Sequence, residues 1–288
     1  MDVFPDNRSL REYLQSARVS GSSIGLVPTM GNLHAGHLSL IQTALENSDL
    51  VVASIFVNPL QFGKDEDLDA YPRTMESDIK ALEQAGCHCL FAPSVGELYQ
   101  GALSGQTLVH VPELTRNYCG ASRPGHFDGV ATVVSRLFNI VNPDKAFFGL
   151  KDYQQFLVIE KMTRDLAYAI DIIGVPTVRE HNGLAMSSRN GYLNDSQKSD
   201  ASQMHATLQF TRKQILAGSR DFARLENEAI EKLKQANLEP DYFAICDANS
   251  LLAATTATQK LVILAAVRIG STRLIDNLVF DIQAPGSS

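Results

Sequence analysis

The chain has 288 residues, 44% of them hydrophobic and 20% charged, which is an ordinary composition for a globular protein able to bury a sizeable core. The net charge of −7 argues against a general nucleic-acid binder, although a local positive site could still bind ATP. The sequence has no apolar stretch long enough to span a bilayer, and residues 1–6 lack the basic start and apolar core of a signal peptide. We therefore expect a cytoplasmic protein that binds neither nucleic acid nor a membrane.

Strand-like and helix-like segments alternate along the first part of the chain. The expected strands are short apolar runs at residues 24–27, 50–57, 89–92, 107–111, 146–149 and 170–175. The expected helices carry apolar residues at helical spacing and cover residues 38–45, 74–85, 130–141 and 153–168. This alternation predicts right-handed βαβ units, and hence a Rossmann-like α/β fold with a mostly parallel sheet covered by helices on both faces.

The chain changes character near Pro176, where the last of these strands ends. Two polar, amphipathic helices are expected at residues 197–217 and 222–236, and strands at residues 242–247, 261–269 and 274–280. The sequence therefore predicts two domains, a Rossmann-like domain over residues 1–176 and a smaller α+β domain over residues 177–288. Residues 284–288 are expected to form a loose tail.

The four cysteines are Cys87, Cys89, Cys119 and Cys246, and they form no C-x-x-C pair. The segment Cys87-His88-Cys89 could suggest zinc, but it lies beside an expected strand. Small buried thiols in a reducing compartment are the favoured interpretation.

The most informative segment is His34-Ala35-Gly36-His37, because it joins an expected strand to an expected helix. That position lines the ligand crevice of a parallel sheet, and the helix start offers unpaired N–H groups that suit phosphate. Gly36 leaves room for close approach, and two imidazoles three residues apart can lie along a polyphosphate. A surface pair or two ligands of a metal are the alternatives, and a metal would need a third protein ligand.

Polar side chains follow two more of the expected strands. Asn58 and Gln61 offer amide groups that can donate to a carboxylate and accept from a hydroxyl, although Asn-Pro could simply make a turn. At the end of the strand 146–149, Gly149 would let the backbone turn and Lys151 would place a mobile cation at the crevice. Asp152 could hold a ribose hydroxyl, although a capping Asp and a solvated Lys are the plainer alternatives.

A further polar segment lies just past the expected domain boundary. Ser187 and Ser188 supply hydroxyl donors, and Arg189 a fixed fork that fits phosphate oxygens, although a polar linker would have the same composition. Arg123 and His126 form a loop-like cationic segment that a structural turn explains equally well.

The H-x-G-H motif after a first strand resembles the signature of class I aminoacyl-tRNA synthetases and related nucleotidylyl transferases. Together with the downstream motifs, the chain from about Gly25 to about Asn277 resembles the pantothenate synthetase (pantoate–β-alanine ligase) family. The resemblance implies an ATP-dependent ligase that joins pantoate to β-alanine through a pantoyl adenylate, releasing AMP and diphosphate. It also implies Mg²⁺ on the ATP phosphates, no tightly bound cofactor and a homodimer.

The resemblance assigns site residues as well. The residues with implied catalytic roles are His34, His37, Lys151 and Arg189. The implied ATP contacts are Met30, Gly31, Asn32, Leu33, His34, Ala35, Gly36, His37, Gly149, Leu150, Lys151, Asp152, Val178, Met186, Ser187, Ser188 and Arg189. Pantoate is implied to contact Gln61 and Gln155, and β-alanine Gln61. The segment 186–189, M-S-S-R, stands in the place of the mobile K-M-S-K-S loop, and Leu150 stands where family members usually have Glu.

Three other functions compete with this interpretation. A nucleotidylyltransferase would keep the adenylyl group on its product, a silent nucleotide-binding module would turn over no ATP, and a His-based metallohydrolase would depend on a metal. The residues alone lead only to an adenylating enzyme of the H-x-G-H type, and they name no protein ligand for Mg²⁺.

Overall fold

A computed structural model describes residues 1–63, 66 and 68–282 of the protein. The tail expected at residues 284–288 lies outside this range. Contacts divide the chain into two compact units: Met1–Leu150 with Gln154–Pro176, and Lys151–Tyr153 with Thr177–Ser288. Within the described range, the structure has no helix of the length and apolar character needed to cross a membrane.

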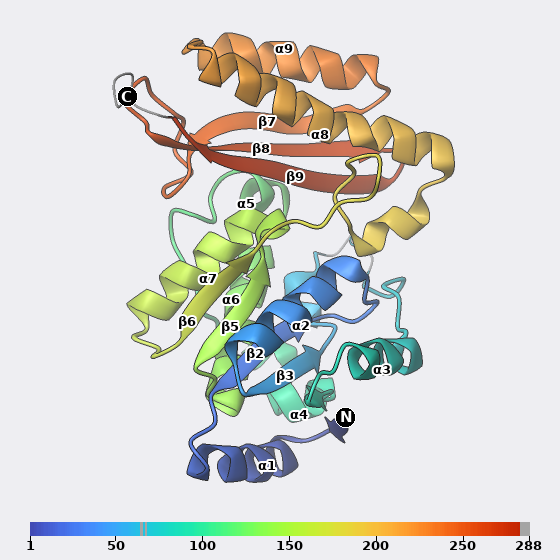
Figure 1. Ribbon diagram of the computed structural model, residues 1–288, viewed down its shortest axis with the longest axis vertical. Coiled ribbons are helices and arrows are strands. Elements are labelled where there is room, and N and C mark those ends of the chain that lie inside the picture. Colours follow the sequence, from blue (N-terminus) through green and yellow to red (C-terminus); the bar gives the residue numbers. More distant parts are fainter. Residues whose placement is uncertain (64–65, 67, 283–288) are drawn as a thin grey trace. The chain divides into compact units, whose positions relative to one another are not determined.

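The first unit contains a parallel sheet, of which β2, β3, β5 and β6 are labelled in Figure 1. It has six strands in the order β1-β4-β3-β2-β5-β6. The strands, all paired in parallel, are β1 (Asp2–Phe4), β2 (Ile24–Thr29), β3 (Leu50–Ile55), β4 (Cys89–Phe91), β5 (Lys145–Gly149) and β6 (Asp171–Val175). The α/β class with a parallel sheet is therefore confirmed. The strand expected at residues 107–111 is wrong: Leu108 is 53% exposed, and the N–H of Val109 donates to the Thr132 hydroxyl (2.9 Å).

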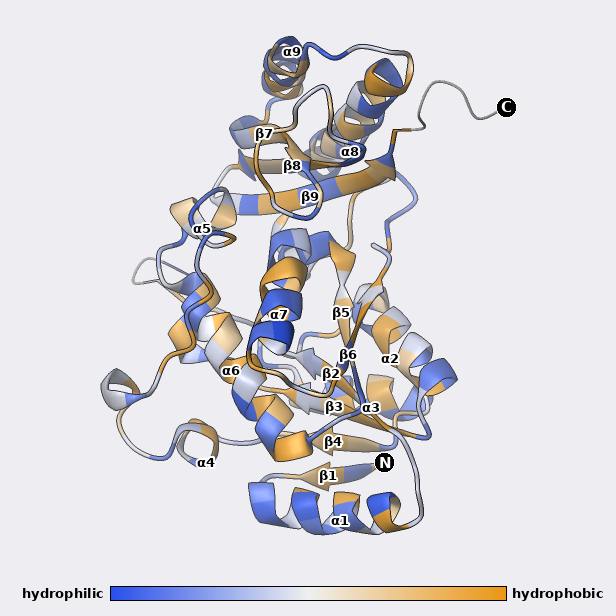
Figure 2. Cartoon of the chain, turned by 90° about the vertical axis from the view of Figure 1, so that its left-hand side faces the viewer, coloured by the Kyte–Doolittle hydropathy of each residue, from blue (hydrophilic) through white to orange (hydrophobic). Residues whose placement is uncertain are grey.

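Helices cover both faces of this sheet (Figure 2). They are α2 (Ala35–Asn47) and α3 (Met75–Gln84) on one face, and α6 (His126–Val141) and α7 (Tyr153–Asp165) on the other. Neighbouring residues of β5 show why both faces need cover. Phe147 is buried in the core beneath α2, whereas Phe148 meets the ring of Phe138 on α6 edge-on, at 6.5 Å between centroids. Strands that bury both faces are mostly apolar, and β3, which is buried at every position, shows this.

The amino-terminal elements are absent from the sequence-based expectations. Helix α1 (Asn7–Val19) begins at Asp6, whose carboxylate accepts the N–H of Ser9, and it buries only Leu10 and Leu14 completely. Strand β1 has three residues, too few for a period-two pattern to show. The described part of the unit also has five shorter helices: η1 (Pro59–Gln61), α4 (Val95–Tyr99), η2 (Leu103–Gly105), α5 (Cys119–Ser122) and η3 (Leu150–Asp152), the last shared with the second unit.

The second unit is an antiparallel sheet of order β7-β8-β9 with two long helices and a 3₁₀ helix. Its elements are η4 (Ser188–Tyr192), α8 (Asp195–Leu216), α9 (Phe222–Gln235), β7 (Glu239–Asp247), β8 (Lys260–Ile269) and β9 (Thr272–Asp281). Alternate residues of β8, from Leu261 to Ile269, pack in one core with Leu208 of α8 and Leu225 of α9. The three expected strands and two expected helices are confirmed.

Candidate active site

Three of the polar segments follow neighbouring strands of the parallel sheet. Strand β2 lies between β3 and β5, and all three run in the same direction (Figure 1). The carboxyl ends of parallel strands form one edge of a sheet, which is where open α/β sheets bind their ligands. The segments that begin at Met30, Phe56 and Leu150 therefore start from the same edge.

The two histidines of the H-x-G-H motif cap helix α2 reciprocally. His34 is the N-cap, and its Nδ1 accepts the N–H of Gly36 (3.1 Å), while Nδ1 of His37 accepts the N–H of His34 (3.3 Å). A backbone N–H can only donate, so Nδ1 of each neutral ring is an acceptor and the proton is on Nε2. The rings lie 4.1 Å apart between centroids. The pair thus presents Nε2–H donors at a helix start, which suits phosphate oxygens.

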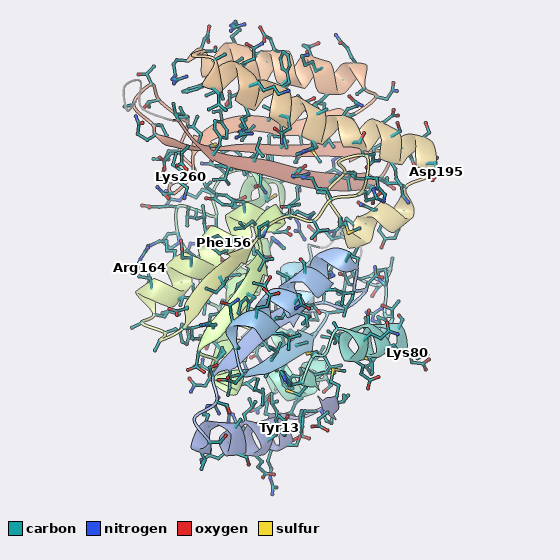
Figure 3. All side chains as sticks on the ribbon, in the orientation of Figure 1. Tyr13, Lys80, Phe156, Arg164, Asp195 and Lys260 are labelled. Carbon is teal, nitrogen blue, oxygen red and sulfur yellow. The ribbon has the colours of Figure 1, made fainter. Side chains whose placement is uncertain are left out.

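A buried carboxylate from helix α3 holds the loop before this motif. Asp78 accepts the N–H groups of Asn32 (2.9 Å) and Leu33 (2.8 Å) and the hydroxyl of Thr74 (3.0 Å). The loop needs this support because Gly31 and Asn32 are both in the left-handed region, at φ +79° and +51°. Lys80, two residues along the helix, points outward (Figure 3). Asp78 was not among the sequence candidates, since an Asp side chain is ordinarily exposed.

The amide of Gln61 lies beside the H-x-G-H loop. Asn58 caps the turn η1, and Gln61 at its end is buried, with Nε2 3.1 Å from Sδ of Met30. The structure therefore brings together two of the predicted site residues that are 31 positions apart in the chain.

Arg123 and His126 hold the backbone of the same turn. Arg123 makes a two-bond ion pair with Glu66 (2.6 and 2.7 Å) and donates to Nε2 of His126 (2.9 Å). Nδ1 of His126 must then carry the proton, which it donates to the carbonyl of Gln61 (2.8 Å). Burial works against ionisation of Glu66, but the hydrogen bonds and charge of Arg123 outweigh it and lower the pKa. The sequence left two alternatives for Arg123 and His126, a site segment or a structural turn. In the structure both residues hold the Gln61 turn.

Of the two adjacent glutamines that open helix α7, Gln154 has a structural task. Its carbonyl oxygen accepts the N–H of Cys119 (3.1 Å), and its amide donates to the carbonyls of Leu114 (2.7 Å) and Asn117 (2.9 Å). Gln155, the expected pantoate contact, is half-buried on the same first turn. The turn before the helix does not depend on glycine, because a Cβ at Gly149 would meet nothing within 4 Å.

Lys151 and Asp152 belong to the second unit. Nζ of Lys151 lies 3.5 Å from the carboxylate of Asp152, and the carbonyl of Lys151 accepts the side-chain amide of Asn277 on β9 (2.8 Å). Asn277 was not among the sequence candidates, although it holds the backbone of one of them.

The M-S-S-R segment follows directly from a small hairpin in the second unit. The N–H of Met186 donates to the carbonyl of Val178 (2.9 Å), so these two expected ATP contacts face one another. Ser187 caps η4 by accepting the N–H of Arg189 (3.2 Å). The buried amide of Asn190 then ties the segment back to the carbonyl of Ala185 (3.1 Å).

A buried charge network lies under this hairpin. Arg179 makes a two-bond ion pair with Asp276 (2.6 and 2.9 Å), whose side chain is 1% exposed, and donates to the carbonyl of Gly183 (3.2 Å). His205 on α8 lies 3.7 Å from the same carboxylate. Burial and the charge of Arg179 lower the pKa of His205, and Asp276 only partly opposes them. Neither Arg179 nor Asp276 was among the sequence candidates.

In the Cys87-His88-Cys89 segment the two cysteines are buried, whereas His88 is exposed. Both thiols donate to the carbonyl of Val51, and Nδ1 of His88 accepts the N–H of the same residue (2.9 Å). Burial raises the pKa of Cys87 to about 11 and that of Cys89 to about 12. All four cysteines are free and buried, and the described part of the chain has no group of three His, Cys, Asp or Glu that could hold a metal ion. The favoured interpretation as buried thiols is confirmed.

These features define a class of α/β proteins in which an H-x-G-H turn joins a parallel strand to a helix. The chain belongs to the pantoate–β-alanine ligase family, because residues 2–279 match the family profile described as Pantoate-beta-alanine ligase.

Individual relatives agree with this assignment over nearly their full length. A pantothenate synthetase of Pseudomonas fluorescens is 55% identical over 278 residues, which cover 96% of this chain and 98% of that protein. The crystal structure of pantothenate synthetase from Thermus thermophilus has a TM-score of 0.90 at 43% identity and covers 96% of this chain and 99% of that one. A pantoate–β-alanine ligase from Francisella tularensis, solved with β,γ ATP and β-alanine, has a TM-score of 0.82 at 32% identity, covering 97% of each chain.

Proposed function

We propose that this chain condenses pantoate with β-alanine through a pantoyl-adenylate intermediate. The observation that carries the proposal is the reciprocal capping of His34 and His37, which puts two imidazole N–H donors at the start of a helix. The match to the family over residues 2–279 indicates which acid and which amine are the substrates.

The reaction has two displacement steps. A carboxylate oxygen of pantoate attacks the α-phosphorus of ATP, the bond to the β-phosphate oxygen breaks, and diphosphate leaves. The amine of β-alanine then attacks the acyl carbon, the C–O bond of the mixed anhydride breaks, and AMP leaves with the electron pair. Neither step needs a covalent enzyme intermediate, so the protein supplies positioning and positive charge where phosphate charge develops.

We assign the phosphate chemistry to His34, His37, Lys151 and Arg189. The capped imidazoles would donate from Nε2, and the two cations would offset charge on the transferred phosphoryl group. Segments 30–37, 149–152 and 186–189, with Val178, would hold ATP. Mg²⁺ would be carried mainly by the ATP phosphates, because it keeps several waters and needs few protein ligands.

We assign pantoate to Gln61 and Gln155 and β-alanine to Gln61. The turn that carries Gln61 is held at its carbonyl by His126 and next to Met30 by its own amide. The Francisella tularensis relative was solved with β,γ ATP and β-alanine, which supports binding of both kinds of ligand here.

We further propose that residues 1–176 form the ATP- and pantoate-binding domain, that residues 177–288 form a smaller domain carrying M-S-S-R at its start, and that the enzyme is a cytoplasmic homodimer without a tightly bound cofactor. Four free thiols suit a reducing compartment. Cell fractionation tests the cytoplasmic location, and sedimentation analysis tests the homodimer.

The decisive test follows the carboxylate oxygen. With pantoate labelled with ¹⁸O in its carboxylate, one label should appear in AMP, and AMP should be released in quantity only when β-alanine is present. Label found in phosphate or diphosphate instead would show an acyl-phosphate route and refute the adenylate. Retention of the adenylyl group on the final product would show a nucleotidylyltransferase.

A further inference from the structure

A chain of buried polar side chains runs from helix α4 to the turn η1. The hydroxyl of Tyr99, the last residue of α4, lies 2.7 Å from Oδ1 of Asn58. Nδ2 of Asn58 lies 3.1 Å from Oε1 of Gln61. Tyr99 and Asn58 are each 1% exposed, so water cannot readily replace either partner.

Two backbone groups fix the direction of every bond in this chain. The N–H of Leu60 points to Oδ1 of Asn58 (3.2 Å), and the carbonyl of Gly129 faces Nδ2 (3.0 Å). An N–H can only donate and a carbonyl can only accept, so the Asn58 amide cannot be reversed without losing both. Tyr99 must therefore donate to Oδ1, and Nδ2 must donate to Oε1 of Gln61.

The fixed direction of these bonds also sets the orientation of Gln61, the predicted substrate contact. Oε1 of Gln61 is turned to Asn58, and Nε2, 3.1 Å from Sδ of Met30, is the end turned to the H-x-G-H loop. Gln61 consequently offers N–H groups on that side, and these match an acceptor such as a carboxylate or hydroxyl oxygen.

We propose that Tyr99 is a positioning residue that acts through Asn58 to present Gln61 as a hydrogen-bond donor to the oxygen atoms of the acid substrate. This inference rests on the proposed function, in which Gln61 meets pantoate. Tyr99 does not itself touch the substrate, and it is distinct from the phosphate-directed residues.

The surroundings of Tyr99 keep its hydroxyl a donor. The ring lies beside Phe56 (5.9 Å between centroids) and under the guanidinium of Arg136 (5.1 Å). Arg136 is itself held by the carbonyl of Leu98 (2.8 Å) and the amide oxygen of Gln106 (2.6 Å). Burial raises the pKa of Tyr99 and outweighs the opposing charge of Arg136, so the phenol keeps its proton at neutral pH.

The main test is Tyr99→Phe, which keeps the ring and removes the donor. Asn58 Oδ1 then keeps only the longer bond from Leu60, and the Gln61 amide is held less firmly. We expect the KM for pantoate to rise about three- to tenfold, the value of one neutral hydrogen bond, with the KM for ATP changed less than twofold. Tyr168→Phe is the matched control, because its hydroxyl pairs with Ser135 (2.6 Å) away from Gln61, and it should leave both constants unchanged.

A second variant changes Asn58, which links Tyr99 to Gln61. Asn58→Asp keeps an acceptor for Tyr99 but can donate neither to Oε1 of Gln61 nor to the carbonyl of Gly129, so it should raise the KM for pantoate more than Tyr99→Phe does. Thermal unfolding of each variant confirms that it is folded, and Asn58→Asp keeps the proposal testable if Tyr99→Phe is poorly folded.

A double-mutant cycle separates positioning from general support. In a Gln61→Ala background, adding Tyr99→Phe should change the KM for pantoate less than twofold, because the residue it positions is gone. Full multiplication of the two effects, or a silent Tyr99→Phe beside a strong Gln61→Ala effect, would overturn the inference. If Gln61→Ala itself leaves pantoate use unchanged, the error lies in the proposed function instead.

Discussion

His37 has two separable tasks, because its Nδ1 caps helix α2 and its proton is on the other ring nitrogen, Nε2. We expect His37→Ala and Lys151→Ala each to slow the adenylation step by about 10²–10³, the usual effect of removing one preorganised donor. Preformed pantoyl adenylate should bypass much of the defect, since amine attack needs less phosphate activation. Single-turnover kinetics of each half-reaction measures both steps.

His37→Gln distinguishes the two tasks. Gln is a good N3 residue in a capping box, so this variant should regain the stability lost in His37→Ala while its adenylation remains slow. His110→Ala and Lys161→Ala are controls from exposed ion pairs elsewhere. Near-normal adenylation in His37→Gln would mean that the imidazole serves only the cap.

His205 gives the second unit a pH dependence whose sign can be worked out. Its folded pKa is lowered from 6.5 by burial and by Arg179, so the unfolded chain binds a proton first as the pH falls. Its contribution to stability is therefore complete above pH 6.5 and is lost as the pH falls from 6.5 through the folded pKa. Urea unfolding at a series of pH values should show a smaller loss for His205→Gln than for the parent, while the exposed His181→Gln should behave like the parent.

At the scale of elements, helix α6 and turn η1 approach so closely that a glycine is required. A Cβ at Gly129 would lie 2.3 Å from the carbonyl oxygen of Leu60 and 2.6 Å from the nitrogen of Gln61. Both atoms belong to the backbone, so Gly129→Ala must displace the turn that carries Gln61. We expect it to lower the Tm and to raise the KM for pantoate by about tenfold or more, because a small misplacement of a positioning group is costly.

Gly149→Ala is the matched control, since it places the same methyl group in open space. It should leave the Tm close to that of the parent. Any effect of Gly149→Ala on the KM for ATP would then report on a ligand that approaches its backbone. Equal loss of stability in the two variants would contradict the packing argument.

Some elements of this fold can be predicted from the sequence and others cannot. Strands β2, β3 and β5 could be predicted because most of their residues are buried and apolar. The H-x-G-H segment could be located because its strand and helix are both clear. Asp78, Tyr99 and Asp276 could not, because polar residues ordinarily face solvent and only tertiary contacts 41 to 97 residues away show that these are buried.

At the scale of the whole molecule, the two compact units are not two consecutive stretches of the chain. The sequence places its boundary near Pro176, but residues Lys151–Tyr153 join the second unit. The carbonyl of Lys151 is held by Asn277, 126 positions away, and the hydroxyl of Tyr153 donates to the carbonyl of Ala248, 95 positions away. No local pattern encodes such contacts, so a boundary found from composition alone misses this excursion.

The buried thiols report on each unit separately, and this allows a test of whether the units unfold together. Cys87 and Cys89 lie in the core of the first unit and Cys246 in the second. Each unit has its own core, so each can open by itself. Asp276→Asn leaves Arg179 without its buried partner, a loss of about 3–5 kcal/mol, and should weaken only the second unit.

Thiol labelling under native conditions, resolved by peptide mass, should therefore be faster at Cys246 in Asp276→Asn by about 10²-fold or more, because each 1.4 kcal/mol is a factor of ten. Labelling at Cys87 and Cys89 should keep the parent rate. Glu231→Gln, which breaks an exposed ion pair with Lys234 in the same unit, should change none of the rates appreciably. Equal acceleration at all three cysteines in Asp276→Asn would show instead that the two cores unfold as one cooperative structure. In that case a mutation could not destabilise the unit that carries the M-S-S-R hairpin without also destabilising the parallel sheet.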